Sequence, residues 1–303
     1  MSSGCPLLKG ALAALLLMLS QSVYAAVQVF ACEPEWAALV EALAGERAVV
    51  YTATTARQDP HRIEARPSLI ARMRGADLVV CTGAELEVGW LPVLLQEAGN
   101  ARVRPGGPGY FEAARHAELL EIPAHLDRAQ GDLHAAGNPH LHGDPRRLIP
   151  VARALAATLA AVDPEHAPEY RARLTEFLER WQQALTDWDA RAAPLRGVPI
   201  VQQHRDPYLP DWLGVEVVAV LEPLPGVGPS AAHLARLAAQ LKERPARLIL
   251  RAAYQSARPA DWLAARTGIP SVELPYTVGG SAAAVDLFAL YEDTLARLLA
   301  ALQ

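Results

Sequence analysis

Histidine is the residue type with the most chemistry to offer in this chain of 303 residues, which contains nine of them. His61, His140 and His204 share one setting: each lies in a loop near the carboxyl end of an apolar run, or just ahead of a helical pattern. Ligands of open α/β sheets bind outside the carboxyl ends of the strands. Imidazole suits zinc and other late divalent ions. Each histidine alone is typical of a solvated loop, but their joint placement predicts a zinc site between two domains.

The element that organises the chain around these loops is expected at residues 163–193. Asp163 and Pro164 are typical of a helix start, and apolar residues then recur in steps of three and four until Pro194. A helix of about thirty residues is roughly 45 Å long, too long for an ordinary crossover between strands. A helix of a bundle is one interpretation. The flanking sequences favour the other, a linker that joins two halves.

Short apolar runs alternate with helical segments on both sides of this helix. Continuous apolar runs are typical of a parallel sheet that is covered on both faces. We therefore predict an α/β protein with two open parallel-sheet lobes, joined by one long linker helix, and the metal site in the cleft between the lobes. The expected lobes span residues 26–162 and 194–303. The predicted strands lie at residues 27–32, 48–53, 77–81, 198–202, 215–221, 247–250 and 271–274.

The first 25 residues are typical of a signal peptide. Lys9 supplies the positive charge, an apolar run follows, and cleavage is expected after Ala25. The run is too short to span a bilayer by itself. The chain carries a net charge of −5 and has no basic run, which argues against nucleic acid as a partner. We expect a soluble, exported protein.

Cys32 and Cys81 are the cysteines that remain after the signal peptide. Both follow apolar strand-like runs, so they could end side by side on neighbouring parallel strands. In an oxidising compartment such a pair is a disulfide candidate. Two buried thiols are the alternative, and the wide spacing makes a poor zinc motif.

Several motifs resemble the solute-binding receptors of zinc and manganese ABC importers, and the long middle helix resembles the rigid linker of that family. The resemblance covers the chain from about Val27 to its end. The matching segments are Asp59-Pro60-His61 with Glu64 and Pro67-Ser68, Ala76 to Val80 with Gly83, Asn138 to Pro145, and Glu222-Pro223 with Pro225 to Ser230.

The resemblance implies that His61 and His140 are metal ligands from the first lobe and that His204 is the third ligand. The family's fourth ligand is often a carboxylate after the last strand. Here that segment, residues 276–280, contains Val278 and no carboxylate. Water, or a carboxylate from elsewhere such as Asp59, would have to fill the fourth position.

The family also often carries a loop rich in histidine and acidic residues before the second ligand. Its counterpart here is short, within a stretch at residues 100–143 that lacks a regular pattern, and it makes His134 and His142 candidates for an accessory metal loop. Such a loop would collect zinc weakly at the mouth of the cleft. A disordered loop with scattered histidines is the alternative. The remaining histidines are expected on the surface: His116, His125, His166 and His233.

The function that the resemblance implies is a monomeric periplasmic receptor that binds Zn²⁺ as transported ligand and catalyses no reaction. Its expected partner is the membrane permease of an ABC importer, with a periplasmic metallochaperone as a further partner. Two other classes stay open. A zinc hydrolase also uses three histidines with an open position, but it needs a positioned general base and no HExxH run is present. In a receptor for an organic solute, the histidines would be incidental.

Overall fold

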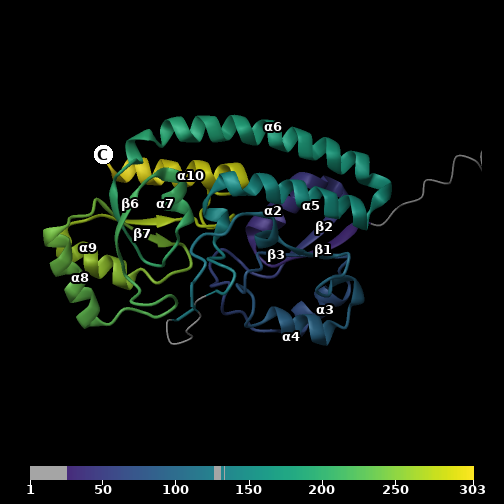
Figure 1. The fold of residues 1–303 in the computed structure, drawn as a ribbon, viewed down its shortest axis with the longest axis horizontal. Helices are drawn as coiled ribbons and strands as arrows, with labels where there is room; N and C mark the ends of the chain where they lie inside the picture. The colour runs from purple at the N-terminus through teal and green to yellow at the C-terminus, as the bar shows by residue number, and fades with distance from the viewer. Residues whose placement is uncertain (1–25, 126–130, 133) are drawn as a thin grey trace, which may run out of the picture.

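The computed structural model describes residues 26–125, 131–132 and 134–303. The expected signal peptide, residues 1–25, lies outside the described residues. Each half of the chain forms a four-stranded parallel sheet, in the order β2-β1-β3-β4 in the first lobe and β6-β5-β7-β8 in the second. The predicted class, two parallel-sheet α/β lobes with a long linking helix, is confirmed (Figure 1).

The first lobe contains four strands and the helices between them. Its strands are β1 (Val27–Ala31), β2 (Ala48–Thr52), β3 (Leu78–Cys81) and β4 (Tyr110–Glu112), and its helices are α2 (Pro34–Ala44), α3 (Pro67–Arg74), α4 (Leu91–Ala98) and α5 (Leu148–Val162). All four residues of β3 are buried, as expected for a strand covered on both faces. Val29 and Leu78 face α2 and α5, whereas Phe30 and Val79 face α3 and α4.

The second lobe repeats this arrangement. Its strands are β5 (Pro199–Gln202), β6 (Glu216–Val220), β7 (Leu248–Ala252) and β8 (Ser271–Leu274), and its helices are α7 (Tyr208–Leu213), α8 (Ala231–Glu243), α9 (Arg258–Thr267) and α10 (Leu287–Ala301). Val201 and Ile249 pack under α8 and α9, whereas Ile200 and Leu248 face the side of α6 and α10. All carboxyl ends of one sheet lie at the same edge, since every pairing is parallel.

The linking helix α6 (Ala167–Arg191) is shorter than predicted and spans about 38 Å at 1.5 Å per residue. The 3₁₀ turns Pro164–His166 and Ala193–Leu195 take up the rest of the expected range. Asp163 does not serve as the N-cap of α6. Its carboxylate instead accepts hydrogen bonds from the Tyr170 hydroxyl at 2.6 Å and His166 Nδ1 at 2.8 Å. The α-helix therefore starts one turn later, with Pro168 in its first turn.

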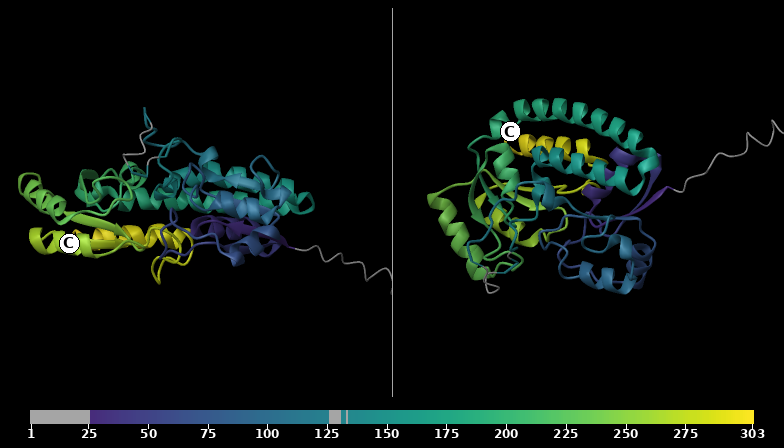
Figure 2. Two further views of the ribbon diagram at one scale, coloured as in Figure 1. Left: turned by 90° about the horizontal axis from the view of Figure 1, so that it is seen from below. Right: turned by 45° about the vertical axis from the view of Figure 1, so that its right-hand side comes forward.

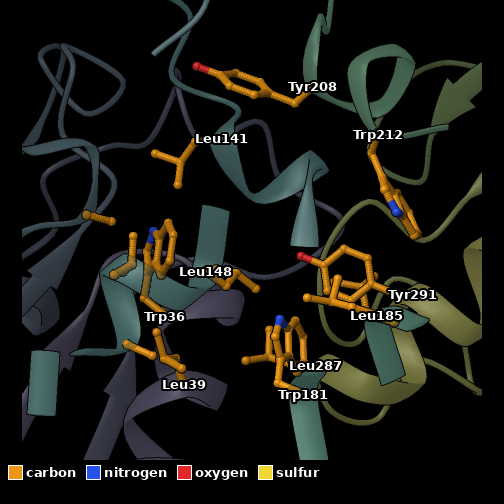
Figure 3. Packing of buried hydrophobic residues seen from close by; sticks show 14 of the residues in the cluster. Trp36, Leu39, Leu141, Leu148, Trp181, Leu185, Tyr208, Trp212, Leu287 and Tyr291 are labelled. Atoms are coloured by element: carbon orange, nitrogen blue, oxygen red, sulfur yellow. The ribbon is translucent and has the colours of Figure 1, made fainter. Parts of the chain in front are cut away.

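One hydrophobic core runs beneath α6 and contains residues of both lobes. Figure 1 shows α6 lying along both lobes with α5 and α10 beside it, and the views of Figure 2 show the same layering. In Figure 3, Trp36 of the first lobe lies to one side of Trp181, a fully buried side chain of α6, and Tyr291 and Trp212 of the second lobe lie to the other side. The lobes are thus joined by shared side-chain packing as well as by the chain itself.

Two short elements were missing from the sequence prediction, and the last helix begins later than predicted. β4 and α7 were not expected, because three- and six-residue elements give too little periodicity to detect. The last helix begins at Leu287 rather than near residue 282, since the Asp286 carboxylate caps it by accepting from Ala289 N at 2.8 Å. Within the described part of the chain, no helix combines the length and apolar character needed to cross a bilayer.

Cys32 and Cys81 form a disulfide in the structure, and both are fully buried. The parallel pairing of β1 with β3 aligns Ala31 with Val80, so the next residue of each strand lies side by side. The disulfide therefore links the carboxyl ends of the two central strands of the first sheet. Of the two sequence-based alternatives, the structure has the disulfide.

Candidate metal centre

Three loops bring His61, His140 and His204 together. His61 lies in the turn between β2 and α3, His140 immediately precedes the 3₁₀ turn Leu141–Gly143, and His204 follows β5 by two residues. Their ring centroids are 5.4 Å apart for His61 and His140, 6.0 Å for His61 and His204, and 5.1 Å for His140 and His204. The cluster therefore draws two imidazoles from the first lobe and one from the second, as the sequence predicted.

Each of the three imidazoles is held through its Nδ1 atom by a neighbouring oxygen. The pairs are His61 with Asp59 Oδ1 at 2.9 Å, His140 with Tyr276 Oη at 2.6 Å and His204 with Glu222 Oε2 at 2.7 Å. A histidine ligand usually donates its second ring N–H to such a partner, which fixes the tautomer and the ring orientation. These contacts leave the Nε2 atoms available to a metal ion.

The Nε2 atoms of His140 and His204 face each other. His140 Nε2 and His204 Nε2 are 3.1 Å apart, a hydrogen-bond distance that requires a proton on one of them. His61 Nε2 is buried and has no hydrogen-bond partner among the described residues. A buried imidazole nitrogen without a partner, on a ring next to two other histidine rings, fits a metal ligand, because a buried polar atom otherwise loses its hydrogen bond with water.

The surroundings shift the pKa values of two of these histidines in opposite directions. Burial and the neighbouring imidazoles hold the pKa of His140 well below its usual range. Burial also acts to lower the pKa of His204, but the hydrogen bond and charge of Glu222 outweigh it, so the pKa of His204 is raised. In the metal-free cluster, His204 is therefore the proton donor and His140 the acceptor across the 3.1 Å contact.

His134 lies at the same cluster, at the mouth of the cleft. Its ring centroid is 5.4 Å from that of His61, and with His140 and His204 it lines a cavity of about 290 Å³. Burial and the nearby His61 lower the pKa of His134 to about 4, so the ring is neutral at pH 7 and one of its nitrogens carries a lone pair. Val278, by contrast, packs against the hydrophobic core. A fourth donor is thus available from the loop rather than from the segment after the last strand.

His142 occupies a different place from the accessory loop in which the sequence suggested it. It is 2% exposed, and its Nδ1 lies 3.2 Å from Glu35 Oε1. Glu35 in turn accepts a hydrogen bond from Thr277 Oγ1 of the second lobe at 2.5 Å. His142 lies in the tight turn Leu141–Gly143, in which Leu141 and His142 are both buried. Among the other histidines, His116 and His125 are exposed, and His166 and His233 are partly so.

Glu222 and Tyr276 are site residues whose roles the sequence did not indicate. Glu222 belongs to a motif that was recognised only as a loop, and Tyr276 belongs to a segment searched for a carboxylate. Tyr276 also has a positive φ of 68°, a conformation that is uncommon outside glycine and asparagine and is enriched at functional sites. Pattern alone offers no signal for either contact, because each partner is more than fifteen residues away in the chain.

The family model described as "Zinc-uptake complex component A periplasmic" matches residues 29–303. The chain belongs to the ZnuA family. This confirms the resemblance to receptors of metal ABC importers that the two Pro-His motifs indicated. A solved structure of ZnuA has a TM-score of 0.76 and 22% identity, and the match covers 92% of this chain and all of that one. The Cd-bound periplasmic metal-binding protein of Candidatus Liberibacter asiaticus has a TM-score of 0.72 with 17% identity over 92% of this chain and all of that chain. These likenesses confirm the fold.

Curated relatives within the family are named for two metals. The high-affinity zinc uptake system protein ZnuA of Bacillus subtilis is 25% identical over 250 residues, which are 81% of this chain and 76% of that protein. The zinc-binding lipoprotein AdcA of Streptococcus pneumoniae is 25% identical over 206 residues, 66% of this chain and 40% of AdcA. The manganese ABC transporter substrate-binding lipoprotein PsaA of the same species is 25% identical over 141 residues, 46% of this chain and 42% of PsaA. The chain thus spans about two fifths of the length of AdcA and PsaA.

Proposed function

We propose that this ZnuA-family protein is a receptor that captures Zn²⁺ in the periplasm and delivers it to the permease of an ABC importer. The observation that carries the proposal is the cluster of three imidazoles from two lobes, each held at Nδ1 with its Nε2 left for an ion. Nitrogen donors of this kind suit zinc. The names of the curated zinc relatives support the same cargo.

His61, His140 and His204 are the proposed zinc ligands, and His134 or a water molecule completes the tetrahedron. His134 is neutral at pH 7 and lines the same cavity. Its loop is held on both sides, because Asp132 N donates to Pro225 O at 3.0 Å and Ala135 N donates to Glu85 Oε2 at 2.7 Å. Of the two histidines considered for an accessory role at the mouth of the cleft, His134 is therefore the one that lies there. His142 is assigned to the packing of the two lobes, since it is buried beside Glu35.

A monomer suffices for this function because all proposed ligands come from one chain. Either free zinc or a periplasmic metallochaperone would supply the ion, and the permease would remove it through the open side of the cavity. A receptor needs no general base, and two carboxylates beside the cluster are engaged with the histidines. Asp59 and Glu222 both accept from a ligand Nδ1, so neither is placed to activate water.

Zinc is expected to bind in strong preference to manganese. Manganese lies at the weak end of the divalent series and prefers oxygen ligands, whereas this site offers imidazoles and has the apolar Val278 in the segment after β8. Val278→Asp should narrow the difference between the two affinities. Comparable affinities of the wild type for zinc and manganese in competition titrations would show that the proposed ligand set is wrong.

Metal analysis and calorimetry test the proposal together. Protein purified without an affinity tag from zinc-replete cells should contain a single tightly bound zinc per chain. His140→Ala should lower zinc affinity by orders of magnitude, whereas the matched control His125→Ala, at an exposed position of the same lobe, should leave it unchanged. Unaltered zinc binding in His140→Ala would reject the site. Zinc-dependent ester or peptide hydrolysis by the wild type would instead favour a hydrolase.

A further inference from the structure

A second group of potential metal ligands lies away from the cleft histidines, at the carboxyl ends of β1 and β3. It consists of the Cys32–Cys81 disulfide and Glu87, and all three are buried. A carboxylate oxygen of Glu87 and the two sulfur atoms all lie within 4.8 Å of one another. The zinc receptor function does not use this group.

The turn that follows Cys81 fixes the carboxylate of Glu87. Thr82 N donates to Glu87 Oε1 at 2.7 Å, and Gly83 N donates to Oε2 at 3.1 Å. Gly83 adopts a φ of 76°, and a Cβ there would lie 2.9 Å from the Cβ of Glu112, so glycine is required for the turn. The acid is therefore placed beside the sulfur atoms by backbone geometry rather than by a flexible contact.

A second buried carboxylate, Glu33, lies next to the first. Thr82 N and Oγ1 donate to Glu33 Oε2 at 3.2 and 3.1 Å, so Glu33 and Glu87 share one threonine. Glu33 is 2% exposed, and its Oε1 atom has no hydrogen-bond partner among the described residues. A buried carboxylate oxygen without a donor is costly unless a cation or proton compensates it.

Burial and a side-chain hydrogen bond between the two acids keep Glu33 and Glu87 from both being ionised. Burial raises the pKa of Glu87 to about 7. Burial, followed by the charges of Glu87 and Glu35, raises the pKa of Glu33 well above its usual range. The sulfur atoms are packed in the apolar cluster of the first lobe with Phe30 and Trp90. A divalent cation at this place would displace the proton that the two acids otherwise retain.

We propose that reduction of the Cys32–Cys81 disulfide converts this group into a second metal site, which holds one thiophilic divalent ion such as Zn²⁺ through two thiolates and the Glu87 carboxylate. Cysteine sulfur and carboxylate oxygen are both zinc ligands. Glu33, which shares the donor Thr82 with Glu87, is a candidate for the fourth position. The site differs from the cleft in being buried and closed, so it would retain its ion rather than pass it on.

The reaction that opens the site balances with a dithiol or phosphine as the reductant. The disulfide accepts two electrons and two protons, its S–S bond breaks, and the reductant is oxidised. The metal ion then displaces both thiol protons to solvent, with the Glu87 proton where that acid is protonated. Reoxidation by a second disulfide, which takes up the two electrons and is reduced to two thiols, re-forms the S–S bond, and the ion leaves because the sulfur atoms no longer carry charge. Disulfide and metal are therefore mutually exclusive at this position.

Cadmium titration of the reduced protein tests the proposal, because thiolate ligation of Cd²⁺ gives a charge-transfer absorption that imidazole ligation does not. Protein is reduced with a phosphine, in denaturant and then refolded if the buried bond resists, and two free thiols are counted before Cd²⁺ is added. We expect a saturable charge-transfer band in the reduced wild type and none in the oxidised wild type. Cys32→Ser should abolish the band, while His140→Ala should leave it in place.

The carboxylate is tested by a conservative change with a matched control. Glu87→Gln keeps the side chain's size but removes its charge, and it should weaken thiolate-dependent cadmium binding by about tenfold or more, roughly 1.4 kcal/mol per factor of ten. The matched control is Glu97→Gln. Glu97 is an exposed acid of α4, so this change should not alter cadmium binding. Two free thiols without a charge-transfer band would overturn the proposal. Undiminished binding in Glu87→Gln would overturn the assigned ligand set.

Discussion

At the cleft, the two lobes meet through polar loops, whereas beneath α6 they share one hydrophobic core. The cleft contacts are individual hydrogen bonds, such as Tyr276 with His140 and Arg57 Nη1 with Ala253 O at 2.9 Å. Beneath α6, fully buried aromatic side chains such as Trp181 and Tyr170 belong to a cluster that contains residues from both sheets. The difference indicates that the core sets the position of one lobe against the other, while the loops set the ligand geometry.

The largest expected effect that separates the two regions is on stability. Trp181 packs against Trp188, Phe288 and Tyr291, and its Nε1 donates to Pro145 O at 2.9 Å. Trp181→Ala should lower the free energy of unfolding by about 3–5 kcal/mol, because it leaves a cavity and an unpaired carbonyl. Denaturant unfolding of the metal-free protein measures this.

The control for Trp181→Ala is Trp262→Ala, since Trp262 lies half-buried at the edge of a separate core in the second lobe. We expect a smaller loss of stability there. Zinc affinity of folded Trp181→Ala should stay close to that of the wild type. A loss of zinc affinity as large as that of His140→Ala would mean that the core also sets the ligand geometry, and the division between the two regions would fail.

Glu222→Gln makes the converse change at the cleft. Glu222 accepts from His204 Nδ1 at 2.7 Å and from Gly226 N at 2.9 Å, and the amide keeps an oxygen but loses the charge. Loss of such a partner of a ligand histidine typically lowers metal affinity by about 10–100-fold. Chelator competition should show this decrease with an unfolding midpoint close to that of the wild type. Glu243→Gln, at an exposed position, is the control, and equal zinc affinities in both variants would remove Glu222 from the site.

The same contrast explains what could be predicted from the sequence. The parallel lobes and α6 come from continuous apolar runs and a long amphipathic period, signals that extend over many residues, so the fold class was predictable. His61, His140 and His204 were placed through strand ends and motif resemblance. The contacts of Glu222 and Tyr276 depend on how loops of the two lobes meet, and no local pattern encodes that. The burial of His142 was missed for the same reason, since a histidine in a Gly-rich stretch gives no sign of the lobe that covers it.

A smaller effect is expected from pH. The raised pKa of His204 means that its proton persists above the ordinary histidine value of about 6.5, and zinc must displace it. Zinc affinity should therefore fall by about tenfold per pH unit below that raised pKa, with release of one proton per ion bound. The folding stability of the protein without zinc depends on pH in the opposite direction. The stabilisation by the His204–Glu222 pair is fully present below the ordinary histidine pKa and is lost as the pH rises through the raised pKa of His204.

Competition titrations of zinc across pH 5.5 to 8.5, in about unit steps, measure the inflection and the slope. In Glu222→Gln the inflection should move to lower pH, because the group that holds the proton on His204 is gone. The plot of log zinc affinity against pH could instead have a slope near three and an inflection at the free-histidine pKa in both the wild type and Glu222→Gln. That result would show that the three imidazoles titrate independently. The proposed coupling between the histidines of the cleft would then be wrong.

The smallest expected effect is on overall shape. A hinge is a loop or element end that absorbs a large backbone change, but here the lobes are connected by the continuous α6 and by buried side chains on both sides of it. Moving one lobe as a rigid body would expose this core, at roughly 25 cal/mol for each Å² of apolar surface. Zinc binding needs only the inward shift of loops that already hold the imidazoles 5 to 6 Å apart. Solution scattering of metal-free and zinc-loaded protein should therefore give nearly the same radius of gyration. A contraction of several ångströms would show that the core beneath α6 rearranges when zinc binds. The core and the cleft loops could then no longer be treated as separate determinants of lobe position and ligand geometry.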